Sequence, residues 1–317
     1  MTPPAPAQPP AVQVVNLERR FGDRAALAGM NFDVAPGERL ALLGPNGSGK
    51  STLMRILATL LRPSGGSARV CGLDVTRERA AVRHRLGTVF QSPSLDGKLS
   101  VRENLRIQGN LYGVTGPELG RRVEEAIGRL GLAERARDRV ETLSGGLKRR
   151  AELAKVLLHR PSVLLLDEPS TGLDPAARLD FWATFLAIQQ ERTLTAVVAT
   201  HLMDEAERCT QAALLDAGRL VALDTPATLK ARLGGTVVDV EAGDPDALVP
   251  RLWERLGLRA RKLGNTLRIE NATGFEAAER IQGAFPREVT AVRVGQPTLE
   301  DVFLALTGRR LAAEEAA

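Results

Sequence analysis

Residues 44–51, with the sequence GPNGSGKS, form the pattern in this chain that points most directly to chemistry. They follow the apolar run 39–43 and precede the helix-like stretch 52–57, so the order is strand, glycine loop, helix. Glycines let backbone N–H groups close around a polyphosphate, and the helix N-terminus adds its positive dipole end. Lys50 adds a full positive charge, and Ser51 offers a hydroxyl to Mg²⁺. The loop therefore predicts a bound nucleoside triphosphate.

A second candidate site lies where the apolar run 163–166 ends in two adjacent carboxylates, Asp167 and Glu168, followed by Pro169. Such a run is typical of a buried parallel strand, which delivers its last residues to the carboxyl edge of the sheet. The backbone turns at the strand end, so neighbouring carboxylates can take separate tasks. We expect Asp167 to hold Mg²⁺ and Glu168 to polarise a water molecule.

Between these two motifs lies another loop suited to phosphate. Ser144, Gly145 and Gly146 lie in the segment 143–147, just before the helix-like stretch 148–158. Ser144 can cap this helix, and the glycines leave its amide groups open to an anion. Taken alone, Ser-Gly-Gly is an ordinary loop before a helix. In a chain that already carries a phosphate loop, it predicts a second phosphate-binding helix start.

Together these motifs resemble the nucleotide-binding subunit of ATP-binding cassette (ABC) transporters, over roughly residues 12–230 and with every family motif in order. Residues 44–52 resemble the Walker A loop, 143–147 the signature, 163–169 the Walker B strand and 170–174 the D-loop. The resemblance implies that ATP is bound by residues of these motifs. They are Gly44, Asn46, Gly47, Ser48, Gly49, Lys50, Ser51, Thr52, Ser144, Gly145, Gly146 and Asp174.

Three further residues match single positions of the family pattern. Gln91 resembles the Q-loop glutamine, and His201 resembles the switch histidine. Phe21 fits the aromatic residue that stacks on adenine; the family usually has Tyr there, and Phe keeps the stacking face. The resemblance implies catalysis by Glu168 as general base, with His201 at the γ-phosphate and Gln91 as sensor. The Mg²⁺ ligands that it implies are Ser51, Gln91 and Asp167.

The resemblance also implies how the two phosphate sites work together. In this family two subunits pack head to tail, so that ATP lies between the Walker A loop of one and the signature of the other. For this chain that implies ATP hydrolysis, a second copy as partner in a homodimer, and a separate transmembrane permease that the ATPase drives. Charge stabilisation of phosphoryl transfer by Lys50, Mg²⁺ and the opposing signature fits this arrangement. The implied location is cytoplasmic, peripheral on the cytoplasmic face of the cell membrane.

Two features narrow the subfamily. Leu147 replaces the glutamine that usually ends the signature, a change that we expect to retune the closed dimer without abolishing hydrolysis. Residues 297–308 are similar to the C-terminal segment of the exporter branch of the daunorubicin-resistance type. The resemblance therefore implies export of a drug-like or lipid-like compound, with the cargo chosen by the permease.

Composition agrees with a globular protein of more than one domain. The chain has 317 residues and 44% hydrophobic content, enough for one full domain and a smaller one. Aromatic residues make up 3%, which leaves few platforms for stacking on single strands, so no nucleic-acid partner is expected. Cys71 and Cys209 lack metal-like spacing, which fits a reducing compartment. We find no apolar run of about 18 to 20 residues for a spanning helix and no signal-peptide pattern.

The order of elements indicates an α/β fold: a P-loop NTPase core with an antiparallel β subdomain and a helical insert, plus a small C-terminal α+β domain. Residues 1–10 are Pro-rich and are expected to form a disordered arm. We expect the nucleotide-binding domain at 11–232, its helical subdomain at about 92–160, and an accessory domain at 235–317. The accessory domain carries no catalytic pattern, so a regulatory or docking role and a passive stabilising role both stay open.

Two other classes of function compete with transport. A non-transport ABC ATPase acting on nucleic acid or the ribosome usually has two cassettes or a long coiled coil after Walker A. Here one cassette is present, and only about 90 residues separate Walker A from the signature. A small-molecule kinase with a phosphate loop would leave the LSGGL sequence at 143–147 unexplained. ATP turnover without an acceptor substrate would separate the kinase from the two ATPases.

Overall fold

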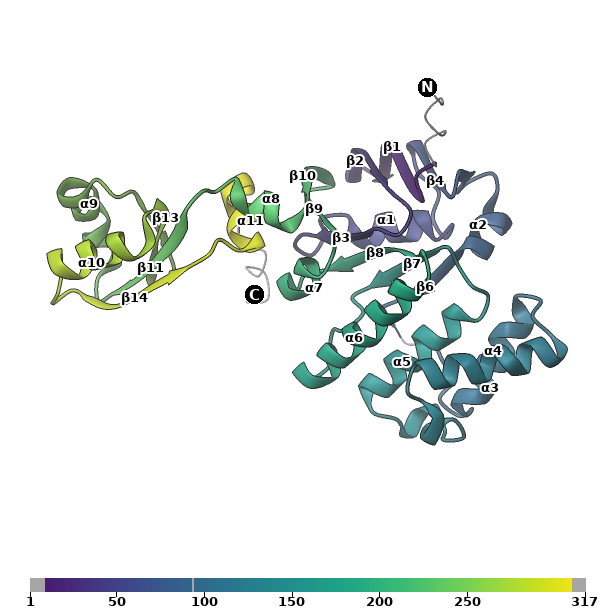
Figure 1. The fold of residues 1–317 in the computed structure, drawn as a ribbon. Coiled ribbons are helices and arrows are strands. Elements are labelled where there is room, and N and C mark those ends of the chain that lie inside the picture. The colour runs from purple at the N-terminus through teal and green to yellow at the C-terminus, as the bar shows by residue number, and fades with distance from the viewer. Residues whose placement is uncertain (1–8, 93, 310–317) are drawn as a thin grey trace, which may run out of the picture. The chain divides into compact units, whose positions relative to one another are not determined.

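The computed structural model describes residues 9–92 and 94–309, so most of the predicted arm at 1–10 lies outside the described residues. The described chain divides after Leu223 into two compact units, and Figure 1 labels most of their elements. This division falls before the predicted boundary at residue 232, because α8 (Pro226–Ala231) contacts α11 (Leu299–Thr307) in the second unit. The assignment of domains at 11–232 and 235–317 stays a prediction.

A six-stranded sheet forms the centre of the first unit, in the order β10-β9-β3-β8-β7-β6. Strand β3 pairs in parallel with β8 and β9, and β7 pairs in parallel with β6 and β8. Parallel strands share one carboxyl edge, so the segments after β3, β6, β7 and β8 meet there. The strands are β3 (Arg39–Leu43), β6 (Leu86–Val89), β7 (Val163–Asp167), β8 (Thr195–Thr200), β9 (Gln211–Asp216) and β10 (Arg219–Asp224).

A four-stranded antiparallel sheet in the order β2-β1-β4-β5 accompanies the central sheet. The predicted antiparallel subdomain at 12–34 is confirmed as β1 and β2, and β4 and β5 extend it. One face of this sheet and helix α1 (Lys50–Leu57) share a buried apolar core with the central sheet. The strands are β1 (Val12–Phe21), β2 (Arg24–Val34), β4 (Gly65–Val70) and β5 (Leu73–Asp74).

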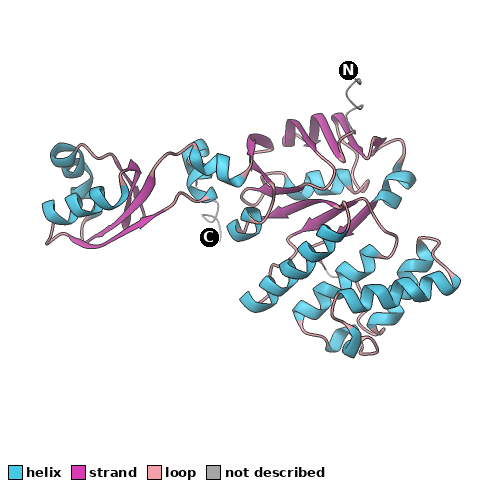
Figure 2. Ribbon diagram, viewed as in Figure 1, coloured by secondary structure: helices cyan, strands magenta, loops and turns pink. Residues whose placement is uncertain are grey.

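The predicted helical insert contains α3 (Val101–Leu111), α4 (Gly116–Arg129) and α5 (Gly145–Leu157), and Figure 2 shows it as a helical region apart from the strands. A capping box between Ser100 and Glu103 starts α3. Helix α4 buries residues at helical spacing, namely Leu119, Val123, Ala126 and Ile127. Short 3₁₀ turns and further helices complete the unit: Ala133–Arg135, Val140–Thr142, α2 (Arg79–Arg85), α6 (Pro175–Glu191) and α7 (Met203–Glu207).

The second unit is a four-stranded antiparallel sheet in the order β12-β13-β11-β14, with two helices on one face. Val238, Val240, Leu267 and Ile269 alternate along their strands and pack against the buried faces of α9 and α10. The sequence predicts strands at 237–240, 266–270 and 289–294 and a helix at 246–256 in this unit, and it contains no clear signal for β12 or α8. The remaining elements are β11 (Thr236–Ala242), α9 (Pro245–Leu256), β12 (Ala260–Leu263), β13 (Thr266–Ala272), α10 (Gly274–Ala284) and β14 (Val289–Gly295).

Across residues 9–92 and 94–309, no helix is both long enough and apolar enough to cross a membrane.

Candidate nucleotide-binding site

The loop after β3 has a backbone that only glycine can supply at two positions. A Cβ atom on Gly44 would lie 2.3 Å from the carbonyl oxygen of Leu215, and one on Gly49 would lie 2.7 Å from that of Ala26. Gly49 also has a φ of 105°, and it precedes α1 without any side-chain cap. The first N–H groups of α1 therefore stay available to an anion. The hydroxyl of Ser48 is buried and has no hydrogen-bond partner among the described residues.

Lys50 is the first residue of α1, and its side chain turns back into the loop. Its Nζ donates hydrogen bonds to the carbonyl oxygens of Gly44 at 2.5 Å and Pro45 at 2.9 Å. Burial lowers the pKa of Lys50, and the nearby carboxylates of Glu168 and Asp167 oppose that shift. A polyphosphate in this loop would supply the negative charge that favours the protonated lysine.

A cleft of about 320 Å³ opens beside the loop. It joins the predicted adenine-stacking residue, Phe21, to the predicted phosphate loop and to Glu168. Phe21 is half exposed, and the guanidinium of Arg19 lies 4.4 Å from the centroid of its ring. The cleft is large enough for a small-molecule ligand, for which roughly 300–1,000 Å³ is usual. Its lining consists of Phe21, Arg24, Ala26, Asn46, Gly47, Gly49, Lys50, Ser51, Thr52 and Glu168.

The carboxylate of Glu168 brings the predicted catalytic residues together. Its Oε2 accepts a hydrogen bond from Nε2 of Gln91 at 3.3 Å and another from Oγ1 of Thr171 at 3.2 Å. Its Oε1 lies 3.2 Å from Nδ1 of His201. Gln91 and His201 are not among the lining residues of the cleft, and they reach it through Glu168. Residues 91, 168 and 201 meet because β6, β7 and β8 are adjacent parallel strands.

Asp167 ends β7 and is buried beside this cluster, with 9% of its surface exposed. Burial raises the pKa of Asp167, repulsion from Glu168 raises it further, and Lys50 opposes both effects. A buried carboxylate in this position fits a cation. The described residues contain no group of three His, Cys, Asp or Glu side chains arranged for a metal ion. The oxygens of Ser51, Gln91 and Asp167 are hard ligands of the kind that Mg²⁺ prefers, with phosphates and water completing its shell.

Sequence reasoning missed Arg149, a residue of α5 that ties the catalytic segments together. Its buried guanidinium donates to the carbonyl oxygens of Phe90 at 2.7 Å, Glu168 at 2.8 Å and Pro169 at 2.6 Å. Phe90 directly precedes Gln91, so one side chain fixes the backbone on both sides of the Gln91–Glu168 hydrogen bond.

Arg149 is itself held by an ion pair of 2.7 Å with Glu152, whose other oxygen accepts from the N–H of Ser94. The sequence does contain a signal for this ion pair, namely the spacing of its two residues. Arg149 and Glu152 stand three residues apart on the helix face that also carries Leu153 and Val156, and charges on an apolar face need partners.

The signature and D-loop residues lie outside this cleft. Ser144 caps α5, because its Oγ accepts from the N–H of Leu147 at 3.4 Å. Asp174 caps α6, because its Oδ1 accepts from the N–H of Ala177 at 2.9 Å. A Cβ atom on Gly146 would lie 3.1 Å from that of Ala177, so the two helix starts pack together. In the described chain, neither Ser144, Gly145, Gly146 nor Asp174 lines the cleft that holds Lys50.

Comparison with known proteins identifies the relatives of this chain. A family model described as ABC transporter matches residues 27–171. The daunorubicin resistance ATP-binding protein DrrA3 of Streptomyces coeruleorubidus is 39% identical over 97% of this chain and 99% of its own. The Nod factor export ATP-binding protein I of Paraburkholderia xenovorans is 36% identical, over 95% and 98%. The linearmycin resistance ATP-binding protein LnrL of Bacillus subtilis is 33% identical, over 95% and 99%.

Solved structures agree in fold. The cbiO1 protein of Clostridium perfringens, part of the ABC transporter complex cbiONQ, has a TM-score of 0.65 at 28% identity and covers 78% of this chain and 96% of its own. A dimeric ATP-binding cassette in a post-hydrolysis state with ADP and Pi has a TM-score of 0.61 at 26% identity, over 68% and 98%. The predicted α/β P-loop NTPase fold is confirmed.

The fold and the site define an ATPase built on a P-loop core with a helical insert. The chain belongs to the ABC transporter family, among its ATP-binding proteins. The predictions of the family, of ATP as the nucleotide and of ATPase activity are confirmed.

Proposed function

We propose that this chain is the ATP-hydrolysing subunit of an exporter. It works as a head-to-tail homodimer with Mg²⁺ and drives a separate transmembrane permease from the cytoplasmic face of the membrane. One observation carries the proposal: the carboxylate of Glu168 is shared between Gln91 and His201 at the edge of a cleft that also contains Lys50. Three polar groups from three strand ends converge on the place where the γ-phosphate of a bound ATP would lie.

In this proposal, Phe21 stacks on adenine and Lys50 leaves the carbonyls of its loop to contact the β- and γ-phosphates. Ser51, Gln91 and Asp167 would hold Mg²⁺, which supplies neutralisation of phosphate charge. Glu168 takes the proton of the attacking water on a carboxylate oxygen, and His201 orients toward the γ-phosphate. The remaining loop residues bind the triphosphate by their position in the loop. They are Gly44, Asn46, Gly47, Ser48, Gly49 and Thr52.

The separation of the two phosphate sites supports the proposed homodimer. The N-terminus of α5, with Ser144, Gly145 and Gly146, presents open amide groups outside the cleft of its own chain. A second copy would bring this helix start to the γ-phosphate. Asp174 would act through the position of the D-loop, because its carboxylate caps α6.

A second cleft, of about 220 Å³, supports the permease as partner. Phe90 and Ser94 line it on either side of Gln91, together with Leu60 and Lys155. Leu60 is 60% exposed, and Arg83 adds a second basic side chain to the lining. A cleft with exposed apolar surface and basic side chains suits a short helix of the permease that ends in an acidic or polar residue.

The relatives of this chain support the proposed direction of transport and the proposed class of cargo. Proteins whose names refer to resistance to daunorubicin or linearmycin, or to Nod factor export, cover nearly the whole of this chain. They favour export of a drug-like or lipid-like compound over an activity on nucleic acid or the ribosome.

Glu168→Gln tests the proposal. The amide keeps the shape of the side chain and cannot take a proton, so ATP affinity should stay while steady-state ATPase activity falls by about 10²-fold or more. ATP-bound dimers should accumulate in light-scattering measurements. Glu134→Gln, outside the cleft, is the control. An ATPase rate for Glu168→Gln within a few-fold of the parent rate would exclude Glu168 as the base.

A further inference from the structure

The second unit contains a groove of about 500 Å³ that the ATPase cycle does not use. We propose that this groove binds an amphipathic anion, a small molecule with an apolar body and a carboxylate, sulfate or phosphate head. The proposal is independent of the nucleotide site. The lining residues are Trp253, Gly257, Leu258, Arg259, Ala260, Arg261, Arg268 and Ile269.

The groove lies in the most basic segment of this unit. Between residues 251 and 262 the sequence has five basic residues and one acidic residue, Glu254. Arg251 and Lys262 form ion pairs with acidic residues from other elements, Glu288 and Asp246. Within the residues that the structure describes, the lining arginines Arg259 and Arg261 form no ion pair.

The strand register places two arginines side by side at the groove. Antiparallel pairing of β12 with β13 places Arg261 directly opposite Arg268. Like charges in this position are destabilising unless they are neutralised. Arg268 is neutralised by Asp239 through two hydrogen bonds of 2.7 Å, and by Asp301. Among the described residues, neither of these carboxylates forms an ion pair with Arg261. An anion in the groove would give Arg261 such a partner.

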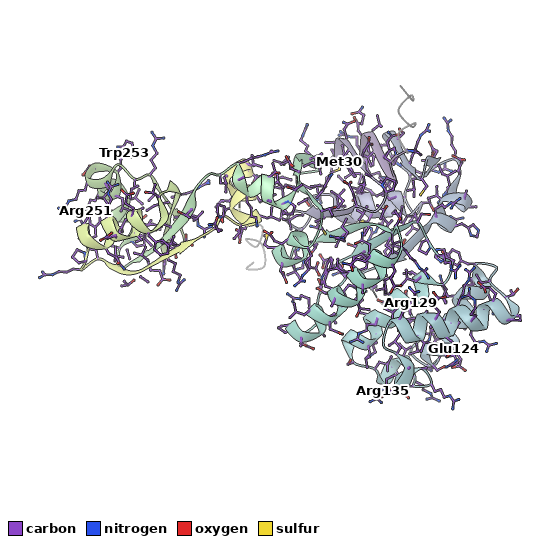
Figure 3. The ribbon with its side chains drawn as sticks, in the orientation of Figure 1. Met30, Glu124, Arg129, Arg135, Arg251 and Trp253 are labelled. Carbon is purple, nitrogen blue, oxygen red and sulfur yellow. The ribbon has the colours of Figure 1, made fainter. Side chains whose placement is uncertain are left out.

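An apolar surface lies beside these charges. Trp253 on α9, labelled in Figure 3, is 52% exposed, although a ring of this size is usually covered. The guanidinium of Arg259 lies 5.0 Å from the centroid of its ring. Leu258, Ala260 and Ile269 add aliphatic surface. Apolar surface beside unpaired guanidinium groups matches a ligand with one apolar part and one anionic part.

The test uses the full-length chain and three probes with unbranched alkyl tails of eleven or twelve carbons: laurate, dodecyltrimethylammonium and dodecyl maltoside, each below its micelle concentration. Laurate should change the tryptophan fluorescence saturably, and the other two should not. The chain has two tryptophans, and Trp182 is fully buried, so the response should disappear in Trp253→Phe.

The double variant Arg259→Gln/Arg261→Gln should bind laurate about tenfold more weakly. Arg293→Gln is the matched control, because Arg293 is exposed on the opposite edge strand and pairs with Glu241. Its affinity should be unchanged. ATP affinity should be the same in all variants, so failure here would leave the proposed ATPase role untouched.

Several results would overturn the proposal. Equal responses to the three probes would show an apolar surface without anion selectivity. Unchanged affinity in the double variant would show that the guanidinium groups do not bind the head. Binding to anionic phosphatidylglycerol vesicles without any binding of monomeric laurate would assign the patch to a membrane surface instead.

Discussion

Glu168 is positioned by its backbone before its side chain makes any contact. Its φ of 48° is unusual for a residue other than glycine, and it turns the chain at the end of β7. The N–H of Glu168 donates to the carbonyl oxygen of Ala199 at 2.8 Å, and its own carbonyl accepts from Arg149. The sequence predicted that a carboxylate stands here. Its contacts with Gln91 and His201 depend on strand order, which local sequence does not encode.

Arg149 should be the most costly single residue to remove near the site. Arg149→Met removes the guanidinium donor from three carbonyl oxygens and leaves Glu152 buried without its ion-pair partner. Breaking a buried ion pair from one side costs about 3–5 kcal/mol. Arg150→Met is the matched control, because the partner of Arg150 is the exposed Asp180 and such a pair contributes about 1 kcal/mol or less. Urea unfolding checks both, and equal losses would refute the assignment.

Asp167 should destabilise the protein when no ligand is bound. Its pKa is raised by burial and by Glu168, so its ionised form is less favourable in the folded than in the unfolded chain. That unfavourable contribution is absent at low pH and grows as the pH rises above the unfolded value of 3.8. At pH 7, Asp167→Asn should therefore raise the ligand-free Tm. Mg²⁺-dependent ATP affinity should fall in the same variant. A lower Tm by calorimetry would contradict this account.

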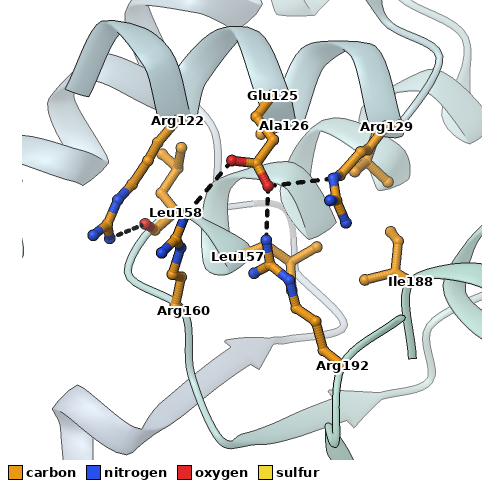
Figure 4. Close-up of a pocket in the computed structure, with 10 residues that line it drawn as sticks. Arg122, Glu125, Ala126, Arg129, Leu157, Leu158, Arg160, Ile188 and Arg192 are labelled. Atoms are coloured by element: carbon orange, nitrogen blue, oxygen red, sulfur yellow. Dashed lines mark hydrogen bonds and ion pairs between the residues drawn. The ribbon is translucent and has the colours of Figure 1, made fainter. Parts of the chain in front are cut away.

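Among the elements, helix α4 connects the helical insert to the rest of the first unit through one carboxylate. Glu125 on α4 accepts from Arg192, which follows α6, at 2.8 Å, and lies 3.7 Å from Arg160, which follows α5. Arg121 and Arg129 on the same helix also contact it. Figure 4 shows Arg129, Arg160 and Arg192 directed at Glu125. One negative charge thus holds the ends of three helices.

Glu125→Gln should destabilise the first unit more than Glu124→Gln, the same substitution at the neighbouring residue. The substitution leaves four guanidinium groups around a neutral side chain, and we expect a loss of about 1–2 kcal/mol that shrinks at high salt. Glu124→Gln removes an exposed pair with Arg102 inside the insert and should cost less than about 0.5 kcal/mol. Urea unfolding at two salt concentrations makes the comparison. Equal effects of the two variants would mean that the Glu125 cluster is ordinary surface.

Elements with strong periodicity were predictable, and weak ones were not. The apolar runs of β3, β7 and β8 were clear in the sequence because buried parallel strands are apolar throughout. Strand β12 was missed because it is a short edge strand, and its Arg261 and Lys262 hide the alternation. Helix α8 was missed because its six residues make a stable element only through contact with α11.

For the whole molecule, the sequence motifs were sufficient to predict the fold class and ATP as the nucleotide; the residues assigned to the ATP site stay a prediction. Each motif occupies a few consecutive residues, so its chemistry can be recognised without knowledge of the rest of the chain. The Arg149 network and the charge pattern of the second unit were not predictable, because both join residues far apart in sequence. The signature lies outside the cleft of its own chain. The central claim for the whole molecule is therefore that the signature of one subunit completes the ATP site of the other.

Mixing two inactive variants tests the composite site directly. Lys50→Ala removes the charge of the phosphate loop, and Ser144→Arg blocks the signature. Neither homodimer should therefore contain a working site. A mixed dimer pairs the intact phosphate loop of the Ser144→Arg chain with the intact signature of the Lys50→Ala chain. Random pairing of equal amounts should restore about a quarter of the parent ATPase rate. A mixture that stays as inactive as its components, although both are folded and the Ser144→Arg chain binds ATP, would contradict a site shared between two subunits.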